Sequence, residues 1–378
     1  MTATTPEFEF SEEIAELRSI VRQFCAAYSP ESVVRETMEG DGFDPSLWQR
    51  LGSELGVLGL AVPEEYGGGG AGLVAQAVVV EELGAALLCG PVFGTVGLAM
   101  PALVALEDDA VKQRLLPDLC AGTRTATVVA PLFTGAFEES AVTLEAAREG
   151  DRWLITGNVA QCIDGGAADL LLVIARTPDG LALLGVDGTA EGVNRTSLTT
   201  LDLTRDQTAL SFDRARAQLL ASGDAARAAL ERSIHVASVL LSVEQVGGSQ
   251  RMLDATVAHV SSRKQFGQAI GAFQAVKHRC ANMLIYVETA RSAAYHGVWA
   301  QGDDSIDDAQ LAASLALAVA NESYLAVCAG AIQLHGGLGF TWEASPHLYF
   351  KRATADGLTL GTTTQQLDRL ATLVLDAQ

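Results

Sequence analysis

The sequence contains little that would mark an exported, metal-binding or nucleic-acid-binding protein. Its six cysteines form no CxxC pair, so their spacing predicts neither a metal site nor a disulfide framework. Basic residues are scarce: 25 Lys and Arg against 46 Asp and Glu give a formal net charge of −21, which repels nucleic acid and anionic lipid. We therefore expect a cytoplasmic protein with reduced thiols, no metal, and neither nucleic acid nor a membrane among its partners.

We also expect neither an export signal nor a membrane span in this sequence. Residues 1–13 carry four glutamates and no basic residue, unlike a secretion signal or a transit peptide. The most apolar stretch, residues 71–106, is interrupted by Glu81, Glu82 and several glycines, so we do not expect it to span a membrane. Apolar residues nevertheless make up 49% of the 378 residues, which is enough for a large buried core.

Hydrophobic periodicity changes twice along the chain. In residues 1–123, apolar residues three and four apart predict helices over 12–28, 45–55 and 73–88, and Pro63 followed by Gly67 to Gly70 predicts a loop. In residues 124–220, short apolar runs between turn residues predict β-strands, with a hairpin over Thr177–Gly180.

The helical pattern returns in residues 221–378, with helices expected over 274–301, 306–334 and 363–375. This order predicts a mainly α protein with a central β domain. We divide it into an N-terminal helical domain (1–123), a middle β domain (124–220) set between two helical layers, and a C-terminal helical domain (221–378).

Two segments do not fit ordinary core patterning. Residues 263–268 (RKQFGQ) place two cations, an aromatic ring and amides at a helix end, where Arg263 could bind a pyrophosphate and Phe266 could cover a flat ring. Residues 333–340 (QLHGGLGF) follow a helix with three glycines, more than one C-cap needs, which lets a ligand approach the backbone. On the residues alone, a solvated helix end and a plain turn remain the simpler interpretations.

Together these two segments resemble the C-terminal signatures of the acyl-CoA dehydrogenases. Residues 63–68 (PEEYGG) are similar to the family's N-terminal loop, and residues 150–157 with Ala168 and Asp169 are similar to the frame of its β domain. The resemblance implies an FAD-dependent oxidoreductase that removes two hydrogens from an acyl-CoA thioester. It also implies an N-terminal helical domain, a middle β-barrel-like domain and a C-terminal four-helix bundle.

The resemblance further implies an FAD surface that one subunit offers to its neighbour. Arg263 would pair with the FAD pyrophosphate, and Phe266 would lie on the adenosine side. The positions that match the family's cofactor contacts are Arg263, Phe266, Gln274, Gln333, Gly337, Thr363 and Gln365. An electron-transfer flavoprotein is the implied electron acceptor.

The positions of the catalytic base depart from the family pattern. Where many members have a glutamate after the arginine-rich strand end, this sequence has Gly361, and the alternative base position on the preceding long helix is Ala237. Neither side chain can take a proton, so we assign no catalytic residue with confidence. Glu244 is a weak candidate about two turns further along that helix, and Asp356 is another if the alignment shifts. Alternatively, Glu244 is an ion-paired residue of the helix and Asp356 is a turn residue.

The β domain departs as well. The family's Trp-Ile-Thr segment, which packs against the flavin and offers a hydroxyl near N5, is Gln161, Cys162 and Ile163 here. The stretch that supplies further flavin contacts is reduced to Val129-Ala130-Pro131. The positions that face a neighbour's FAD are therefore kept, while those that would hold this chain's own isoalloxazine are lost.

This pattern resembles the base-deficient subunit of hetero-oligomeric (α2β2) acyl-CoA dehydrogenases of actinobacterial sterol catabolism. The resemblance implies a second acyl-CoA dehydrogenase subunit as partner. Two alternatives stay open: a self-sufficient homotetrameric dehydrogenase with a relocated base, and a flavin-free structural or ligand-binding relative.

Overall fold

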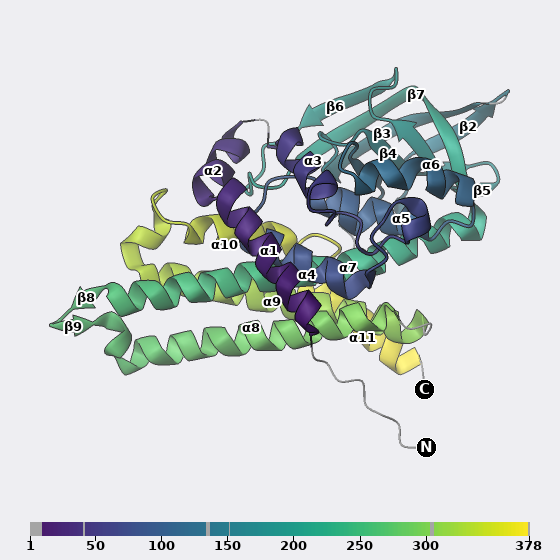
Figure 1. Ribbon diagram of the computed structural model, residues 1–378. Coiled ribbons are helices and arrows are strands. Elements are labelled where there is room, and N and C mark those ends of the chain that lie inside the picture. Colours follow the sequence, from purple (N-terminus) through teal and green to yellow (C-terminus); the bar gives the residue numbers. More distant parts are fainter. Residues whose placement is uncertain (1–9, 41, 134–136, 151, 303–305, 377–378) are drawn as a thin grey trace.

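The computed structural model describes residues 10–40, 42–133, 137–150, 152–302 and 306–376 (Figure 1). The helices predicted over 12–28, 45–55 and 73–88 are confirmed to within three residues at each end. The N-terminal elements are α1 (Glu12–Tyr28), α2 (Glu31–Glu39), α3 (Pro45–Ser53), η1 (Glu64–Tyr66), α4 (Gly72–Ala85), the π-helix η2 (Val92–Ala99), α5 (Met100–Val104) and α6 (Asp109–Cys120).

The middle part is a sheet that closes on itself. The strands pair in the order β1-β4-β2-β3-β7-β5. Strand β5 also pairs with β4, which closes the ring, and β6 pairs with β7. The predicted hairpin is confirmed, because Thr177 pairs with Gly180 across the antiparallel β4–β5 ladder. The elements are β1 (Ala126–Val129), η3 (Glu139–Ala141), β2 (Glu145–Glu149), β3 (Arg152–Ile163), β4 (Leu170–Thr177), β5 (Gly180–Asp187), β6 (Val193–Ser197) and β7 (Gln207–Ser222).

The C-terminal part is a bundle of long helices that run side by side (Figure 1). The three helices predicted there are confirmed as α8, α9 and α11. The elements are α7 (Gly223–Ser262), β8 (Lys264–Gln265), β9 (Gln268–Ala269), η4 (Ile270–Ala272), α8 (Gln274–Ala300), α9 (Ile306–His335), η5 (Gly336–Phe340), α10 (Pro346–Asp356) and α11 (Thr363–Asp376).

The two helical parts contact each other directly, and the sheet lies beside them rather than between them (Figure 1). The reason is the close crossing of α4 and α7. A Cβ atom at Gly247 would overlap the carbonyl oxygen of Glu81, and one at Gly84 would lie 2.5 Å from that of Glu244. Only glycine fits at both points, so these two residues allow the backbones to touch.

Helix α9 belongs to the core of the bundle. The helical stretch Ala309–Phe340 is long and apolar enough to cross a membrane by length and composition. However, 61% of its 18-residue apolar window is buried inside the protein. The stretch packs against α7, α8, α10 and α11, as a core helix does. Within the described ranges, no group of three or more His, Cys, Asp or Glu could hold a metal ion, and the six cysteines are unpaired.

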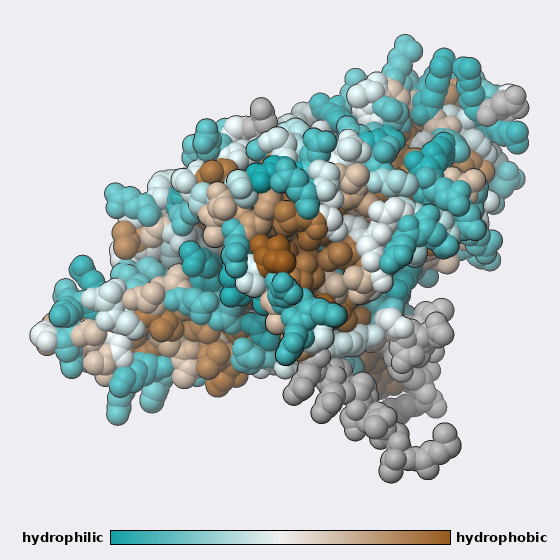
Figure 2. Space-filling view, viewed as in Figure 1, coloured by the Kyte–Doolittle hydropathy of each residue, from teal (hydrophilic) through white to brown (hydrophobic). Residues whose placement is uncertain are grey.

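The surface in the same view is mostly hydrophilic (Figure 2). An apolar area lies near its centre, over the N-terminal helices. On α1, Ile20 is 47% exposed. Further apolar side chains are exposed along α8, including Leu284 and Ile285.

Candidate active site and cofactor surface

Both predicted base positions lie in one apolar core. Ala237 is fully buried on α7, and Leu360, immediately before Gly361, is 2% exposed. Ala237, Leu360 and Ile163 belong to the same cluster of packed hydrophobic side chains. Neither position therefore offers a proton acceptor, since one is a buried alanine and the other a buried glycine.

The loop that carries Gly361 is held by backbone contacts. Leu360 and Gly361 both have positive φ angles, of 58° and 106°. The Leu360 N–H donates to the carbonyl of Leu132 at 2.9 Å, which ties the loop to the chain that follows β1. The amide of Gln366 donates to the carbonyl of Leu360 at 2.6 Å. A side chain at Gly361 would be strained by the backbone conformation.

Glu244 lies in a buried group of charges that joins the middle and C-terminal parts of the chain. Its carboxylate accepts hydrogen bonds from Arg205, at 2.6 Å, and from Arg352 of α10, at 2.5 Å. Asp202 accepts from Arg352 at 2.7 Å, and Asp356 lies 3.3 Å from Arg205. We call these five residues, Asp202, Arg205, Glu244, Arg352 and Asp356, the interdomain charge cluster.

The cluster makes Glu244 a poor proton acceptor. Burial alone would raise the pKa of Glu244, but the adjacent Arg205 and Arg352 hold it below its ordinary value. A general base works best with a pKa near the operating pH and a lone pair free to take the proton. The pKa of Glu244 is shifted away from that range, and its Oε1 is held by two arginines, so its geometry is that of a structural ion pair.

Two other buried carboxyls have raised pKa values. Burial raises the pKa of Asp356 to about 7, against the lowering effect of Arg205, and neither Asp356 oxygen has a hydrogen-bond partner. Burial likewise raises the pKa of Asp164 to about 7; its carboxylate accepts the Gly94 N–H at 2.7 Å. Both side chains are almost completely buried, at 0% and 2% exposed. Their pKa values suit a base, but their burial separates them from a substrate.

Asp164 was missed by the sequence analysis. It directly follows Ile163 at the end of β3, where the chain leaves the sheet. An acid after three altered positions, Gln161, Cys162 and Ile163, is the signal that could have drawn attention to it. Cys162 and Ile163 are buried, so neither of these two positions offers an accessible donor to a flavin ring.

Five of the predicted cofactor residues lie together at one end of the bundle. The β8–β9 hairpin and η5 form this end, which projects from the molecule (Figure 1). Each of the five residues is exposed to solvent, and Phe266 is 91% exposed. We call them the hairpin surface: Arg263, Phe266, Gln274, Gln333 and Gly337.

A histidine pair links the two segments that make the hairpin surface. The rings of His259, near the end of α7, and His335, at the end of α9, stack with centroids 4.3 Å apart. His335 is also held by its own helix, since its Nδ1 lies 2.8 Å from the carbonyl of Ala331. The stacking brings the RKQFG and QLHGG segments to the same end of the molecule.

Thr363 and Gln365 lie apart from the hairpin surface. The neighbouring Gly361 carbonyl contacts Asn321 of α9, which is 14 residues before His335 and so about 21 Å away along the helix. Gln365 caps α11: its side chain accepts the Thr362 N–H at 2.8 Å, and the Thr362 hydroxyl accepts the Gln365 N–H at 3.3 Å. This reciprocal capping box gives Gln365 a structural role.

A closed sheet beside a bundle of long helices is the arrangement of the acyl-CoA dehydrogenase fold. The family model "Acyl-CoA dehydrogenase, N-terminal domain" matches residues 11–123, and "Acyl-CoA dehydrogenase, C-terminal domain" matches residues 223–375. The chain belongs to the acyl-CoA dehydrogenase family, whose members are oxidoreductases.

Curated relatives match over almost their whole length. The acyl-CoA dehydrogenase IpdE2 of Mycolicibacterium smegmatis is 33% identical over 95% of this chain and 98% of that protein. IpdE2 of Mycobacterium tuberculosis is 32% identical over 97% of this chain and 98% of that protein.

Solved structures include two heteromeric assemblies. A variant of the Tcur3481-Tcur3483 steroid ACAD is 32% identical with a TM-score of 0.87, covering 97% of this chain and 98% of that one. The ChsE4-ChsE5 complex from Mycobacterium tuberculosis is 28% identical with a TM-score of 0.87, covering 98% and 99%. Butyryl-CoA dehydrogenase from Megasphaera elsdenii, 22% identical with a TM-score of 0.88, covers 98% of this chain and all of that one, and shares the fold.

Proposed function

We propose that this chain is the base-deficient subunit of an FAD-dependent acyl-CoA dehydrogenase, and that it completes the FAD site of a different, catalytic subunit. The observation that carries the proposal is the loss of a proton acceptor at both base positions, Gly361 and Ala237, within a continuous apolar core. Glu244, the weak candidate on the same helix as Ala237, is neutralised by two arginines.

The residues of this chain suit the adenine and pyrophosphate half of FAD better than its isoalloxazine half. The exposed guanidinium of Arg263 suits a pyrophosphate, and the exposed ring of Phe266 suits an adenine face. Cys162 and Ile163, in contrast, are buried and offer no donor to an isoalloxazine ring. When bound, FAD accepts the hydride from the acyl group; this chain's part is to hold the dinucleotide end of a neighbour's cofactor.

Exposed apolar side chains on α8 support an oligomer. Leu284, Ile285 and Tyr286 are 47%, 63% and 38% exposed, and large apolar side chains left in contact with solvent are typical of an interaction surface. The two heteromeric relatives among the solved structures favour a second acyl-CoA dehydrogenase subunit as the partner. A cytoplasmic location, an acyl-CoA substrate and an electron-transfer flavoprotein as acceptor complete the proposal.

Co-expression with a dehydrogenase encoded next to this chain tests the proposal by flavin counting and by turnover of acyl-CoA with an artificial electron acceptor. We expect a colourless chain alone, and one FAD for each pair of chains in an active complex. A yellow chain that turns over substrate by itself would support the homotetrameric alternative. Absence of flavin both alone and with the partner would support the flavin-free alternative.

A further inference from the structure

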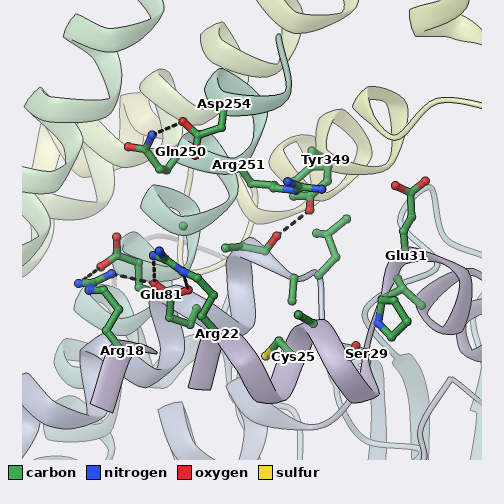
Figure 3. Close-up of a pocket in the computed structure, with 18 of the residues that line it drawn as sticks. Arg18, Arg22, Cys25, Ser29, Glu31, Glu81, Gln250, Arg251, Asp254 and Tyr349 are labelled. Carbon is green, nitrogen blue, oxygen red and sulfur yellow. Dashed lines mark hydrogen bonds and ion pairs between the residues drawn. The ribbon is translucent and has the colours of Figure 1, made fainter. Parts of the chain in front are cut away.

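A large pocket, open to solvent, lies away from the hairpin surface and the interdomain charge cluster. Its volume is about 870 Å³, and it is lined by α1 and α2, by α7 and α10, and by the end of α4 (Figure 3). A volume of a few hundred to ~1,000 Å³ is typical of small-molecule sites. We call it the arginine pocket, because four of the chain's 25 basic residues line it: Arg18, Arg22, Arg251 and Arg291.

Three of these arginines are held by buried carboxylates. Glu81, 3% exposed, accepts a hydrogen bond from Arg18 at 2.8 Å and also pairs with Arg291. Glu82, 5% exposed, accepts two hydrogen bonds from Arg22, each at 2.9 Å. These pairs largely neutralise one another, so they form a fixed polar wall (Figure 3).

Arg251 differs from the other three. Among the described residues, no carboxylate lies within 4 Å of its guanidinium nitrogens, the distance that defines the ion pairs of its neighbours. Its side chain lies against the phenol of Tyr349 instead, and the Tyr349 hydroxyl donates to the carbonyl of Ala85 at 2.7 Å (Figure 3). A guanidinium has five N–H donors, so one phenol oxygen leaves most of them available.

The wall beyond Arg251 is apolar. Val34, Leu87 and Leu348 line it and are 2%, 2% and 3% exposed. The pocket thus places one positive charge without a carboxylate partner beside a hydrocarbon surface. The complementary ligand has one anionic head and an apolar body.

The surrounding carboxylates restrict the charge of that ligand. Glu31, Glu81, Glu82 and Asp254 also line the pocket, and the chain as a whole carries a formal charge of −21. A dianion such as a phosphate monoester would be repelled more strongly than a single carboxylate, which also matches the two-pronged geometry of a guanidinium.

We infer that the arginine pocket binds an amphipathic monocarboxylate, with its carboxylate on Arg251 and its apolar body against Val34, Leu87 and Leu348. The inference does not depend on the proposed function, because no residue of the hairpin surface or of the interdomain charge cluster lines this pocket.

Calorimetric titration of the full-length chain with sodium decanoate tests the inference. We expect saturable binding of one decanoate per chain, with no comparable binding of decyltrimethylammonium, which has the same tail and the opposite charge. Arg251→Gln should weaken binding about tenfold or more, because it removes a charge-assisted hydrogen bond. The matched control is Arg214→Gln, which changes an exposed arginine of β7 paired with Glu149 and should leave binding unchanged.

The apolar half of the pocket has its own test. Ala26 is exposed on α1 and lines the pocket, so Ala26→Trp fills hydrocarbon volume without changing a charge. This variant should unfold at the wild-type urea concentration but bind decanoate more weakly. Absence of saturable decanoate binding, equal binding by Arg251→Gln and wild type, or equal binding of the cationic probe would each overturn the inference.

Discussion

The interior around Gly361 and the projecting hairpin surface are two parts of the molecule with opposite physical character. Near Gly361, apolar side chains fill the space, and the acids Glu244 and Asp356 are buried among arginines. At the hairpin surface, Arg263 and Phe266 are exposed to solvent. The contrast teaches that one fold can bury its acids among arginines in one region while it presents a cation and an aromatic ring to solvent in another.

The largest effect should come from breaking the interdomain charge cluster. Arg352→Met leaves Glu244 and Asp202 buried without their shared cation, which costs about 3–5 kcal/mol of unfolding free energy. Urea unfolding of Arg352→Met and wild type measures this loss of unfolding free energy.

Arg214→Met is the control, since its ion pair with Glu149 is exposed and should cost less than about 1 kcal/mol. If the two variants lost similar amounts of stability, the cluster would not be an important link between the middle and C-terminal parts.

The next effect is a pH dependence. The pKa of Asp356 is about 7 in the fold, above the ~3.9 of an unfolded chain, so the folded state keeps a proton that the unfolded state loses. The contribution of Asp356 to stability is therefore lost as pH rises from about 4 to about 7. Asp356→Asn cannot ionise, so its stability relative to wild type should rise across this window by on the order of 2–4 kcal/mol.

Urea unfolding of both proteins at several pH values checks this. Parallel stability curves for Asp356→Asn and wild type would mean that Asp356 is ionised throughout.

At the hairpin surface, stability and cofactor binding should separate. Arg263→Gln should leave the unfolding free energy unchanged, because Arg263 is exposed, yet lower FAD retention by the co-expressed complex about 10- to 100-fold. Dialysis followed by flavin absorbance measures retention. Lys264→Gln, one residue along, is the control and should retain FAD. Equal retention by wild type and Arg263→Gln would remove the hairpin surface from the cofactor site.

The smallest effect distinguishes the two roles of Gln365. As a capping residue, Gln365→Ala should cost about 1 kcal/mol of stability and leave FAD retention unchanged. If Gln365 contacts the cofactor instead, Gln365→Ala would lower FAD retention and leave the stability unchanged. Thr364→Ala, at the adjacent exposed position in the first turn of α11, is the control and should change neither quantity.

Local signals predicted much of the fold. The helix over 12–28 and the hairpin at Thr177–Gly180 follow from apolar spacing and turn residues that lie close together in the sequence. The π-helix Val92–Ala99 was not predicted, because a continuous apolar run carries no period that distinguishes it from other buried helices.

The site was predictable only in part. The two segments of the hairpin surface could be found because each is a continuous motif. The interdomain charge cluster could not, since Asp202, Glu244 and Arg352 are far apart in the sequence and come together only where α10 packs against α7 and the connection between β6 and β7. Thr363 and Gln365 were grouped with the hairpin surface because a motif match gives residue types but not their positions in space.

The central claim is that this chain has no working proton acceptor for the α-carbon of a thioester. Exchange of the α-hydrogens of acyl-CoA thioesters with deuterium from solvent reports such a base directly, without flavin reduction. The account predicts no exchange above background with this chain alone, and exchange with the co-expressed complex. Exchange by the chain alone that disappears in Glu244→Gln or Asp356→Asn would contradict the claim.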